Sequence, residues 1–463
     1  MEQAWLPDLV YTRGQFIRGL MVVCDESGKI IRLAPETEIA EGNVIRLSRR
    51  ALLPGLVNAH SHAFQRVIRG RTEYRTQNAR DTFWTWRDAM YGVAMRLSPE
   101  DVYDASRMAF LEMALSGITA VGEFHYLHRG PDGGEYEDPN LIAKQVVQAA
   151  KDVHLRIALL RVAYARSGYR TEPDPRHARF IENADVYLKH IEKLKSDLAG
   201  TPRQAWVGLA PHSVRAVPLD YLKQVVRYGD EQKLPVHMHV AEQPAEVSDC
   251  IQEYGRSPVA LLETEGILSD RLTAVHAIHV TPKAIQALAK ARTIVCACPT
   301  TERNLGDGVV QAELLFQGGI RIALGTDSHV QIDLLEDARE LEYHLRLQKT
   351  QRVVLAPAED QGRSALAARL FDCATTKGAE SIGAPGGVIE PGRPADFFTV
   401  DLEDPSIAGA SDEDLLANIV FGLSKTAVRD VVVGGKQIVA EGKHFDQEKF
   451  VDQFTALQKK LWI

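Results

Sequence analysis

Eight short apolar runs, each followed by a stretch of helical character, constrain the fold of this chain more than any other feature. The runs are rich in Val, Ile, Leu and Ala, and continuous apolarity of this kind is typical of parallel strands buried on both faces. The stretches between them carry apolar residues three and four positions apart among charges, as amphipathic helices do. In a chain of 463 residues, eight such units predict an α/β fold, a (β/α)₈ TIM-type barrel with a smaller attached domain. The runs are 51–62, 119–126, 156–164, 205–214, 234–243, 272–280, 293–299 and 321–328.

The two ends of the chain differ from the middle. Short strands separated by turn residues are expected near the N-terminus, at 20–23, 30–33 and 44–47, and near the C-terminus, at 395–401 and in a hairpin over 428–442. Neither end has enough strands for an independent sheet. We therefore expect both ends to pair into one small β-sandwich-like domain, formed by residues 1–50 and 388–463, beside a barrel of residues 51–387.

Charge and composition exclude several kinds of partner. The net charge of −8 and the pI near 6.0 argue against a surface that binds nucleic acid or anionic lipid. Because no signal-like N-terminus or membrane-spanning run is present, the expected location is cytoplasmic and the expected partner is a small-molecule substrate. The five cysteines are odd in number and scattered, so reduced thiols are expected. Cys296 and Cys298 are interpreted as buried small residues rather than as metal ligands.

The first predicted barrel strand ends in a pair of histidines. His60 and His62 are two positions apart, which places both imidazoles on one face of a strand. Barrel enzymes build their sites at the carboxyl ends of the strands. A lone histidine is usually structural, but a pair with this spacing at this position favours a shared metal ion.

Three further strands end in residues that bind metals or transfer protons. The fifth ends in His237 and His239, with Glu242 three positions after His239, and spacing alone does not decide which histidine would be the ligand. The sixth carries His276. The eighth presents Asp327 within Gly-Thr-Asp-Ser, where a carboxylate could bind a metal, accept a proton or cap the next helix. Four strands that all end in such residues predict a metal centre with Glu242 as a proton-transfer group.

Two longer motifs resemble the amidohydrolase superfamily of metal-dependent hydrolases. Leu-Pro-Gly-Leu-Val-Asn-Ala-His-Ser-His at 53–62 is similar to the entry into the barrel of these proteins. Ile-Glu-Pro-Gly-Arg-Pro-Ala-Asp-Phe at 389–397 is similar to their return into the small β-domain. The resemblance extends over nearly the whole chain.

The later motifs resemble the mononuclear deaminase and chlorohydrolase branch of the superfamily. That pattern selects His239 rather than His237 and implies one divalent metal, with Zn²⁺ the best match to three imidazoles and a carboxylate. Two-metal members use a lysine near the middle of the barrel, and neither 156–164 nor 205–214 contains one. The implied ligands are His60, His62, His239 and Asp327.

Four segments resemble the formimidoylglutamate deiminase family, namely 62–66, 83–87, 122–126 and 210–215. The resemblance implies a homodimer that hydrolyses N-formimino-L-glutamate to N-formyl-L-glutamate and ammonia in histidine degradation. Glu242, His276 and Asp327 would be catalytic. Arg215 ends the fourth predicted strand and is the best candidate to clamp a substrate carboxylate, although a surface ion pair is the alternative. The remaining implied substrate contacts are Gln65, Arg87, Tyr126 and His212.

Two other functions fit parts of the same pattern. A deaminase of an aromatic amine, of the guanine or S-adenosylhomocysteine type, would use the same metal site but needs an apolar pocket without clustered arginines. A non-catalytic scaffold would have lost the ligands, all of which are present here. The polar, glycine-rich segment 125–140 is expected to be a loop on the active face, either a lid or a solvated excursion.

Overall fold

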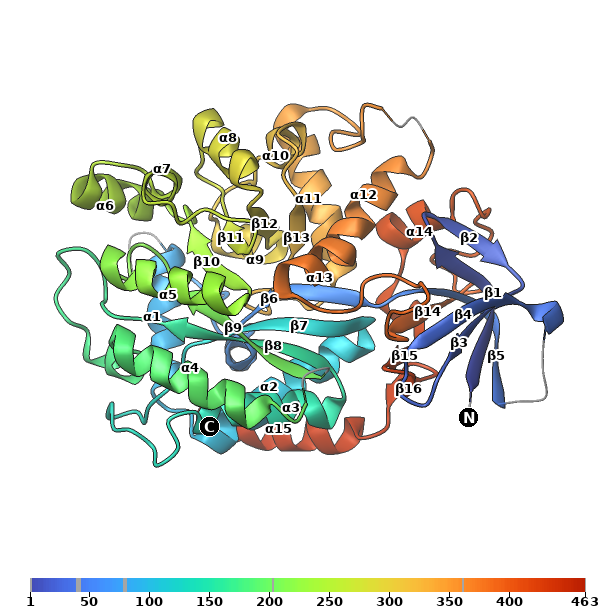
Figure 1. Ribbon diagram of the computed structural model, residues 1–463, viewed down its shortest axis with the longest axis horizontal. Coiled ribbons are helices and arrows are strands. Elements are labelled where there is room, and N and C mark those ends of the chain that lie inside the picture. The colour runs from blue at the N-terminus through green and yellow to red at the C-terminus, as the bar shows by residue number, and fades with distance from the viewer. Residues whose placement is uncertain (1, 39–42, 78–80, 202–203, 360–361, 463) are drawn as a thin grey trace.

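The computed structural model describes residues 2–38, 43–77, 81–201, 204–359 and 362–462, and it contains two sheets (Figure 1). The larger is an eight-stranded parallel sheet in which each strand pairs with its neighbours in chain order. The predicted barrel is thereby confirmed. Its strands are β6 (Leu56–Ser61), β7 (Ile118–His125), β8 (Arg156–Ala163), β9 (Ala205–Pro211), β10 (Val236–Val240), β11 (Leu272–His276), β12 (Ile294–Ala297) and β13 (Ile322–Leu324).

Backbone contacts beyond β13 close the barrel. Ser61 and Asp327 form a parallel bridge. The amide of Asp327 donates to the carbonyl of His60 (3.0 Å), and the amide of His62 donates to the carbonyl of Asp327 (3.1 Å). Gly325 permits this approach, because a Cβ atom there would lie 2.7 Å from the Cβ of His60. The first and last barrel strands therefore meet beside the paired histidines.

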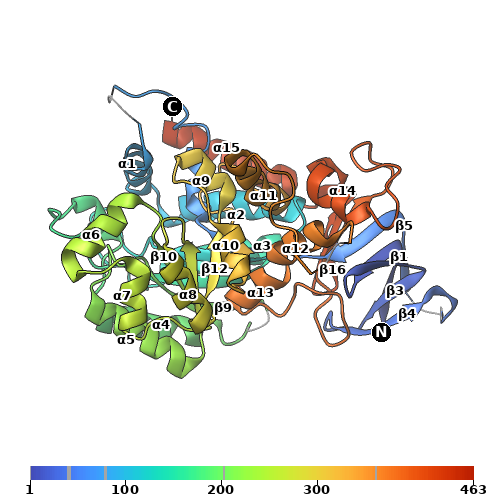
Figure 2. The same ribbon diagram turned by 90° about the horizontal axis from the view of Figure 1, so that it is seen from above.

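Helices surround the barrel (Figure 2). Several begin with proline at the first or second position, where its missing N–H is not needed. A short 3₁₀ segment, η2 (Ala63–Ile68), and the helix α1 (Phe83–Ala94) follow β6 before the first outer helix. The others are α2 (Pro99–Leu115), α3 (Leu141–Val153), α4 (Ala184–Leu198), α5 (Leu219–Gln232), α6 (Pro244–Tyr254), α7 (Pro258–Thr264), α8 (Pro282–Ala291), α9 (Pro299–Leu305), α10 (Ala312–Gln317), α11 (Leu334–Lys349), α12 (Ala365–Ala374) and α13 (Thr376–Ile382).

The first predicted strand, 51–62, is in fact parts of two strands. Its beginning belongs to β5 (Asn43–Pro54) of the smaller sheet, and the barrel strand starts at Leu56. The chain crosses between the sheets at Gly55, where a Cβ would lie 2.2 Å from the Thr119 hydroxyl oxygen. Because residues 51–54 of β5 and all of β6 are buried, apolarity continues across the junction and hides the break.

Both chain ends contribute to the smaller, nine-stranded mixed sheet, as predicted. Trp5 of β1 packs edge-on against Phe397 of β14, with ring centroids 5.3 Å apart. Buried residues of six strands form one cluster around this pair, so the sheet curls around its own core. The strands β1, β2 and β17 were not predicted. The remaining strands are β1 (Gln3–Thr12), β2 (Gln15–Arg18), β3 (Leu20–Cys24), β4 (Ile30–Pro35), β14 (Phe397–Asp401), β15 (Val428–Val433), β16 (Lys436–Ala440) and β17 (Lys443–His444).

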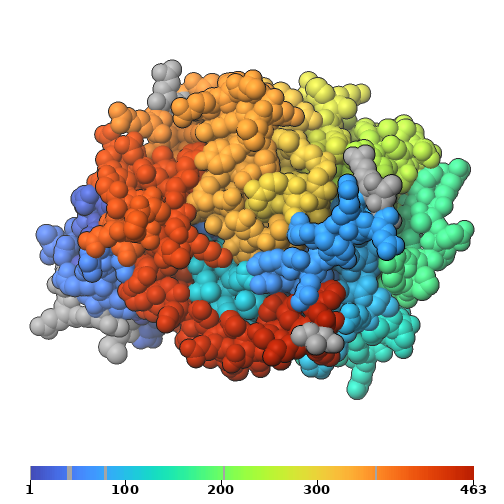
Figure 3. Space-filling model, turned by 180° about the vertical axis from the view of Figure 1, so that it is seen from behind, coloured from blue at the N-terminus to red at the C-terminus, as the bar shows by residue number. Residues whose placement is uncertain are grey.

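The C-terminal segment returns to the barrel after the smaller sheet. The helix α14 (Leu415–Gly422) precedes β15, and the last helix, α15 (Gln447–Trp462), lies along the segment that contains α2 (Figure 3). Lys460 pairs with Asp101 of α2 at 2.7 Å. The domain boundaries at 50/51 and 387/388 remain a prediction. In the described residues, no helix is both long and apolar enough to cross a membrane.

A buried ion pair connects the two sheets. The guanidinium of Arg156, at the start of β8, donates from Nε (2.6 Å) and Nη2 (3.0 Å) to the carboxylate of Asp396, next to β14. The amide of Gly434 donates to the same carboxylate (2.6 Å). All three contacts are between segments far apart in the chain.

We expect Asp396→Asn to lower the free energy of unfolding by about 1.5–3 kcal/mol, the usual contribution of a hydrogen bond to a charged group. Urea unfolding followed by circular dichroism measures the change. Asp412→Asn is the matched control, because its pair with Arg18 is exposed and exposed pairs contribute only about 0–1 kcal/mol. Equal effects of the two substitutions would contradict a stabilising role for the buried pair.

Candidate metal centre and adjoining pocket

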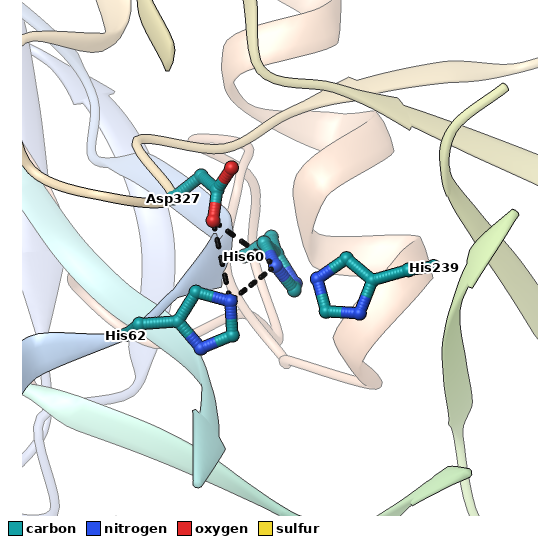
Figure 4. A group of neighbouring side chains, drawn as sticks. All are labelled: His60, His62, His239 and Asp327. Atoms are coloured by element: carbon teal, nitrogen blue, oxygen red, sulfur yellow. Dashed lines mark hydrogen bonds and ion pairs between the residues drawn. The ribbon is translucent and has the colours of Figure 1, made fainter. Parts of the chain in front are cut away.

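Three imidazoles and a carboxylate converge at the carboxyl end of the barrel (Figure 4). They belong to His60, His62, His239 and Asp327, all buried, and one nitrogen or oxygen atom from each lies within 4.8 Å of the others. The structure thus brings together the four residues that the sequence resemblance implies as ligands. His237 is not part of this group, and its Nε2 is hydrogen-bonded to the carbonyl oxygen of Ser381 at 2.9 Å.

The hydrogen bonds around these imidazoles suit a metal ion. The Nδ1–H of His62 donates to the carbonyl of Phe124 (2.9 Å), and the Nδ1–H of His239 donates to the carbonyl of His212 (3.1 Å). Such outer contacts fix the tautomer and leave Nε2 as a lone-pair donor. The Nε2 atoms of His60 and His62 are 3.2 Å apart, and they lie 3.5 and 3.2 Å from Asp327 Oδ1. A cation between these atoms satisfies all of them.

Electrostatics at this group favour bound cations over bound protons. Burial lowers the pKa of His60 to about 3, so its imidazole is a neutral donor near neutral pH. Burial alone would raise the pKa of Asp327, but hydrogen bonds from His60 and His62 hold it well below its ordinary value. Three imidazoles and one carboxylate are a donor set that Zn²⁺ accepts.

Glu242 and His276 lie next to this group. His276 Nε2 is 3.7 Å from Glu242 Oε1 and 3.8 Å from Asp327 Oδ2. Burial lowers the pKa of His276, but the carboxylates of Glu242, Glu302 and Asp327 raise it well above its ordinary value. Burial raises the pKa of Glu242, opposed by the charge of His276 and reinforced by that of Asp327. The arrangement suits proton exchange between neighbouring groups.

Two buried carboxylates that hold these residues in place were missed in the sequence. Glu302 Oε1 lies 3.2 Å from His276 Nδ1 and accepts the amide of Cys298 at 2.9 Å. Glu246 accepts the amides of Ala241 (3.0 Å) and Glu242 (3.1 Å). Ala241 has a left-handed φ of +52°, so Glu246 stabilises a strained turn. Glu246 lies four positions after Glu242, the spacing of one helical turn. This spacing is the sequence signal by which Glu246 could have been found.

A pocket opens beside the metal group, and each residue implied as a substrate contact lines it. They are Gln65, Arg87, Tyr126, His212 and Arg215. Gln65 Nε2 donates to the Tyr126 hydroxyl (2.9 Å), and His212 packs against His239 with ring centroids 4.9 Å apart. Leu305 of α9 and four residues of α1 form other parts of the wall, and of α1 only Arg87 was assigned to the site from the sequence. The four α1 residues are Phe83, Trp86, Met90 and Tyr91.

Two arginines place positive charge at one end of the pocket. The guanidinium carbons of Arg87 and Arg215 lie 4.4 and 5.7 Å from the centre of the Trp84 ring. Buried atoms Nε and Nη1 of Arg87 and Nη1 of Arg215 have no hydrogen-bond partner among the described residues. Burial and the charge of Arg215 lower the pKa of Arg87. Buried donors without acceptors are costly, so this end of the pocket is suited to an anion.

The loop 125–140 contributes less to the pocket than a lid would. Of its described residues, only Tyr126 lines the cavity. The rest is held to the neighbouring segment, with the amides of His128 and Arg129 donating to the carbonyl of Arg179 (3.2 and 3.1 Å). Whether the loop closes over a ligand remains a prediction. The burial predicted for Cys296 and Cys298 is confirmed, since neither exposes surface.

Fold and metal group together define a barrel hydrolase, and comparison with known proteins gives the class. Residues 51–438 match the Amidohydrolase family, and the chain belongs to it. It is 38% identical over 416 residues to formimidoylglutamate deiminase of Pseudomonas aeruginosa, covering 89% of each protein. A 5-methylthioadenosine/S-adenosylhomocysteine deaminase of Syntrophomonas wolfei is 27% identical and covers 92% of this chain and 90% of its own. The crystal structure of an amidohydrolase from Brucella melitensis superposes with a TM-score of 0.91 at 32% identity, over all of both chains.

These relationships confirm the resemblance seen in the sequence. The protein is an enzyme, a hydrolase that acts on C–N bonds. Its family uses a divalent metal, and the donor set described above fits one. The finer questions are which C–N bond is cleaved and which residues act on it.

Proposed function

We propose that this enzyme hydrolyses N-formimino-L-glutamate to N-formyl-L-glutamate and ammonia. The observation that carries the proposal is the pair of arginines in the pocket beside the metal group, Arg87, which is half-buried, and Arg215, which is buried. Buried donor atoms of both guanidinium groups have no hydrogen-bond partner among the described residues. The glutamate part of this substrate bears two carboxylates, which guanidinium groups bind through paired hydrogen bonds. The similarity to the deiminase of Pseudomonas aeruginosa supports the same substrate.

The proposed ligands are His60, His62, His239 and Asp327, and Zn²⁺ is the proposed ion. When bound, a divalent ion supplies Lewis acidity that activates water for attack on the amidine carbon. Arg87 and Arg215 hold the carboxylates, so that the amidine is directed toward Glu242. The hydroxyl of Tyr126, the amide of Gln65 and the ring of His212 border the substrate between the two ends of the pocket.

Glu242 is the proposed proton carrier. Its carboxylate accepts a proton from the attacking water and delivers it to the nitrogen that departs as ammonia. As the C–N bond breaks, the remaining hydroxyl proton passes to Asp327 and the new C–O bond becomes a carbonyl. His276, held at Nδ1 by Glu302, presents Nε2 to the developing oxygen centre. Asp327 Oδ2 faces the same nitrogen at 3.8 Å and shares the base role. Histidine degradation as the setting, the homodimer and the cytoplasmic location are further expectations from the sequence.

Steady-state assays of the zinc-loaded enzyme test the substrate. We expect ammonia release and N-formylglutamate, identified by mass, from N-formimino-L-glutamate. N-formimino-L-glutamine should react with a kcat/KM about 10- to 150-fold lower, because it lacks one carboxylate and so loses a charged hydrogen bond of about 1.5–3 kcal/mol. Guanine and S-adenosylhomocysteine should not react. Turnover of either of them, without turnover of formiminoglutamate, would favour an aromatic amine deaminase instead.

A further inference from the structure

Cys298 belongs to a second group of potential metal donors, which shares Asp327 with the group described above. It follows β12 and precedes α9, and its side chain is fully buried. The sulfur of Cys298, a ring nitrogen of His276 and a carboxylate oxygen of Asp327 lie within 4.8 Å of one another.

The two oxygens of Asp327 face two different sets of donors. Oδ1 lies 3.2 Å from His62 Nε2 and 3.5 Å from His60 Nε2. Oδ2 lies 3.8 Å from His276 Nε2. His276 is fully buried, and its Nε2 has no hydrogen-bond partner among the described residues. A carboxylate oriented in this way can bridge two ions.

Glu302 positions both of the other donors. Its Oε1 lies 3.2 Å from His276 Nδ1 and accepts the amide of Cys298 at 2.9 Å. Nε2 of the His276 imidazole therefore faces the space next to Asp327, and the backbone of Cys298 is held beside the same space. Outer contacts of this kind hold metal ligands in place in known sites.

We propose that His276, Cys298 and Asp327 form a second metal site, which binds a thiophilic divalent ion in excess of the catalytic one and inhibits the enzyme. Nitrogen, sulfur and oxygen donors together select Zn²⁺ or Cd²⁺ over Mg²⁺ or Ca²⁺. The Cys298 thiol and the imidazolium of His276, which frees Nε2 as a donor, each release a proton to solvent as the ion binds. Inhibition follows because the ion occupies His276 Nε2, which otherwise faces Glu242 at 3.7 Å. The site depends on the catalytic metal group and not on which substrate the enzyme hydrolyses.

Cadmium is the probe, added to enzyme that carries one equivalent of zinc. We expect one cadmium ion to bind per chain while the zinc content stays at one, as measured by elemental analysis after gel filtration. The cadmium–thiolate charge-transfer absorption should rise in the ultraviolet in step with this binding, and activity should fall over the same range. The first two readouts need no substrate, so they stand even if the proposed reaction is wrong.

Cys298→Ser is the diagnostic variant and Cys296→Ser the matched control, since Cys296 is equally buried two positions away. Loss of an outer contact alone weakens metal binding by roughly 10- to 100-fold, so loss of the thiolate should weaken cadmium binding by at least about 100-fold. The absorption should disappear in Cys298→Ser and persist in Cys296→Ser. Inhibition is expressed relative to each variant's own rate without cadmium.

Several results would overturn the proposal. In the wild-type enzyme these are cadmium uptake without thiolate absorption, or cadmium that enters only by displacing zinc. Both are measured without any variant, so a misfolded substitution does not obscure the answer. Absorption that survives in Cys298→Ser, or is lost in Cys296→Ser alone, would also reject Cys298 as the ligand.

Discussion

Glu242→Gln should reduce kcat by about 10²- to 10⁴-fold, the range that general acid–base catalysis contributes, while the metal content stays at the wild-type level. The amide has nearly the shape of the carboxylate but cannot carry a proton. Glu242 is outside the four proposed ligands, and its backbone position is held by Glu246. The site should therefore keep its geometry and lose the proton transfer alone.

Steady-state kinetics and elemental analysis of the same preparation separate the two effects. Glu265→Gln is the control, because Glu265 pairs with Lys223 away from the pocket and its loss should leave kcat unchanged. A variant that loses the metal together with the activity would make Glu242 a ligand. A variant that keeps most of its kcat would remove Glu242 from the reaction.

Arg215→Met should lower kcat/KM for formiminoglutamate by about 10- to 150-fold, corresponding to the 1.5–3 kcal/mol of a charged hydrogen bond. Methionine keeps much of the volume beside Trp84 and removes the charge. For a formamidine that lacks carboxylates, the same substitution should change kcat/KM little. Arg87→Met is expected to act in the same direction, because both guanidinium groups border the same ring.

Arg321→Met is the control for charge loss, since Arg321 pairs with Glu380 next to the start of β13, away from the pocket. An equal loss with the carboxylate-free substrate would mean that Arg215 supports the pocket wall instead of binding the substrate. The two arginines also couple to each other, so the double variant should lose less than the product of the single effects.

The sequence predicts the core of the metal group because the geometry of parallel strands is simple. The carboxyl ends of β6, β10, β11 and β13 meet at one end of the barrel, so residues that follow these strands must lie near each other. His60 and His62 are then brought together by their spacing alone. The choice of His239 over His237 needed the family pattern, because alternation along β10 places both on the same face.

Other parts of the site depend on contacts that no local pattern records. Glu302 reaches His276 across 26 residues. The α1 residues line the pocket because of how that helix lies over the end of the barrel. In the sequence, its apolar residues are equally consistent with a place in the hydrophobic core. The left-handed backbone at Ala241, His276 and Asp327 is imposed by tertiary structure. The break at Gly55 was hidden because the residues on both sides of it are buried.

Because the barrel closes where β6 meets Asp327, the proposed metal ligands come from both sides of this junction. His60 and His62 are near the beginning of the barrel sequence, and Asp327 is about 270 positions later. No fragment that stops short of β13 can assemble the group, and an ion bound there would link the first and last strands of the barrel. Metal loading should then stabilise the whole barrel against unfolding, so that the ion needed for the chemistry also holds the barrel closed.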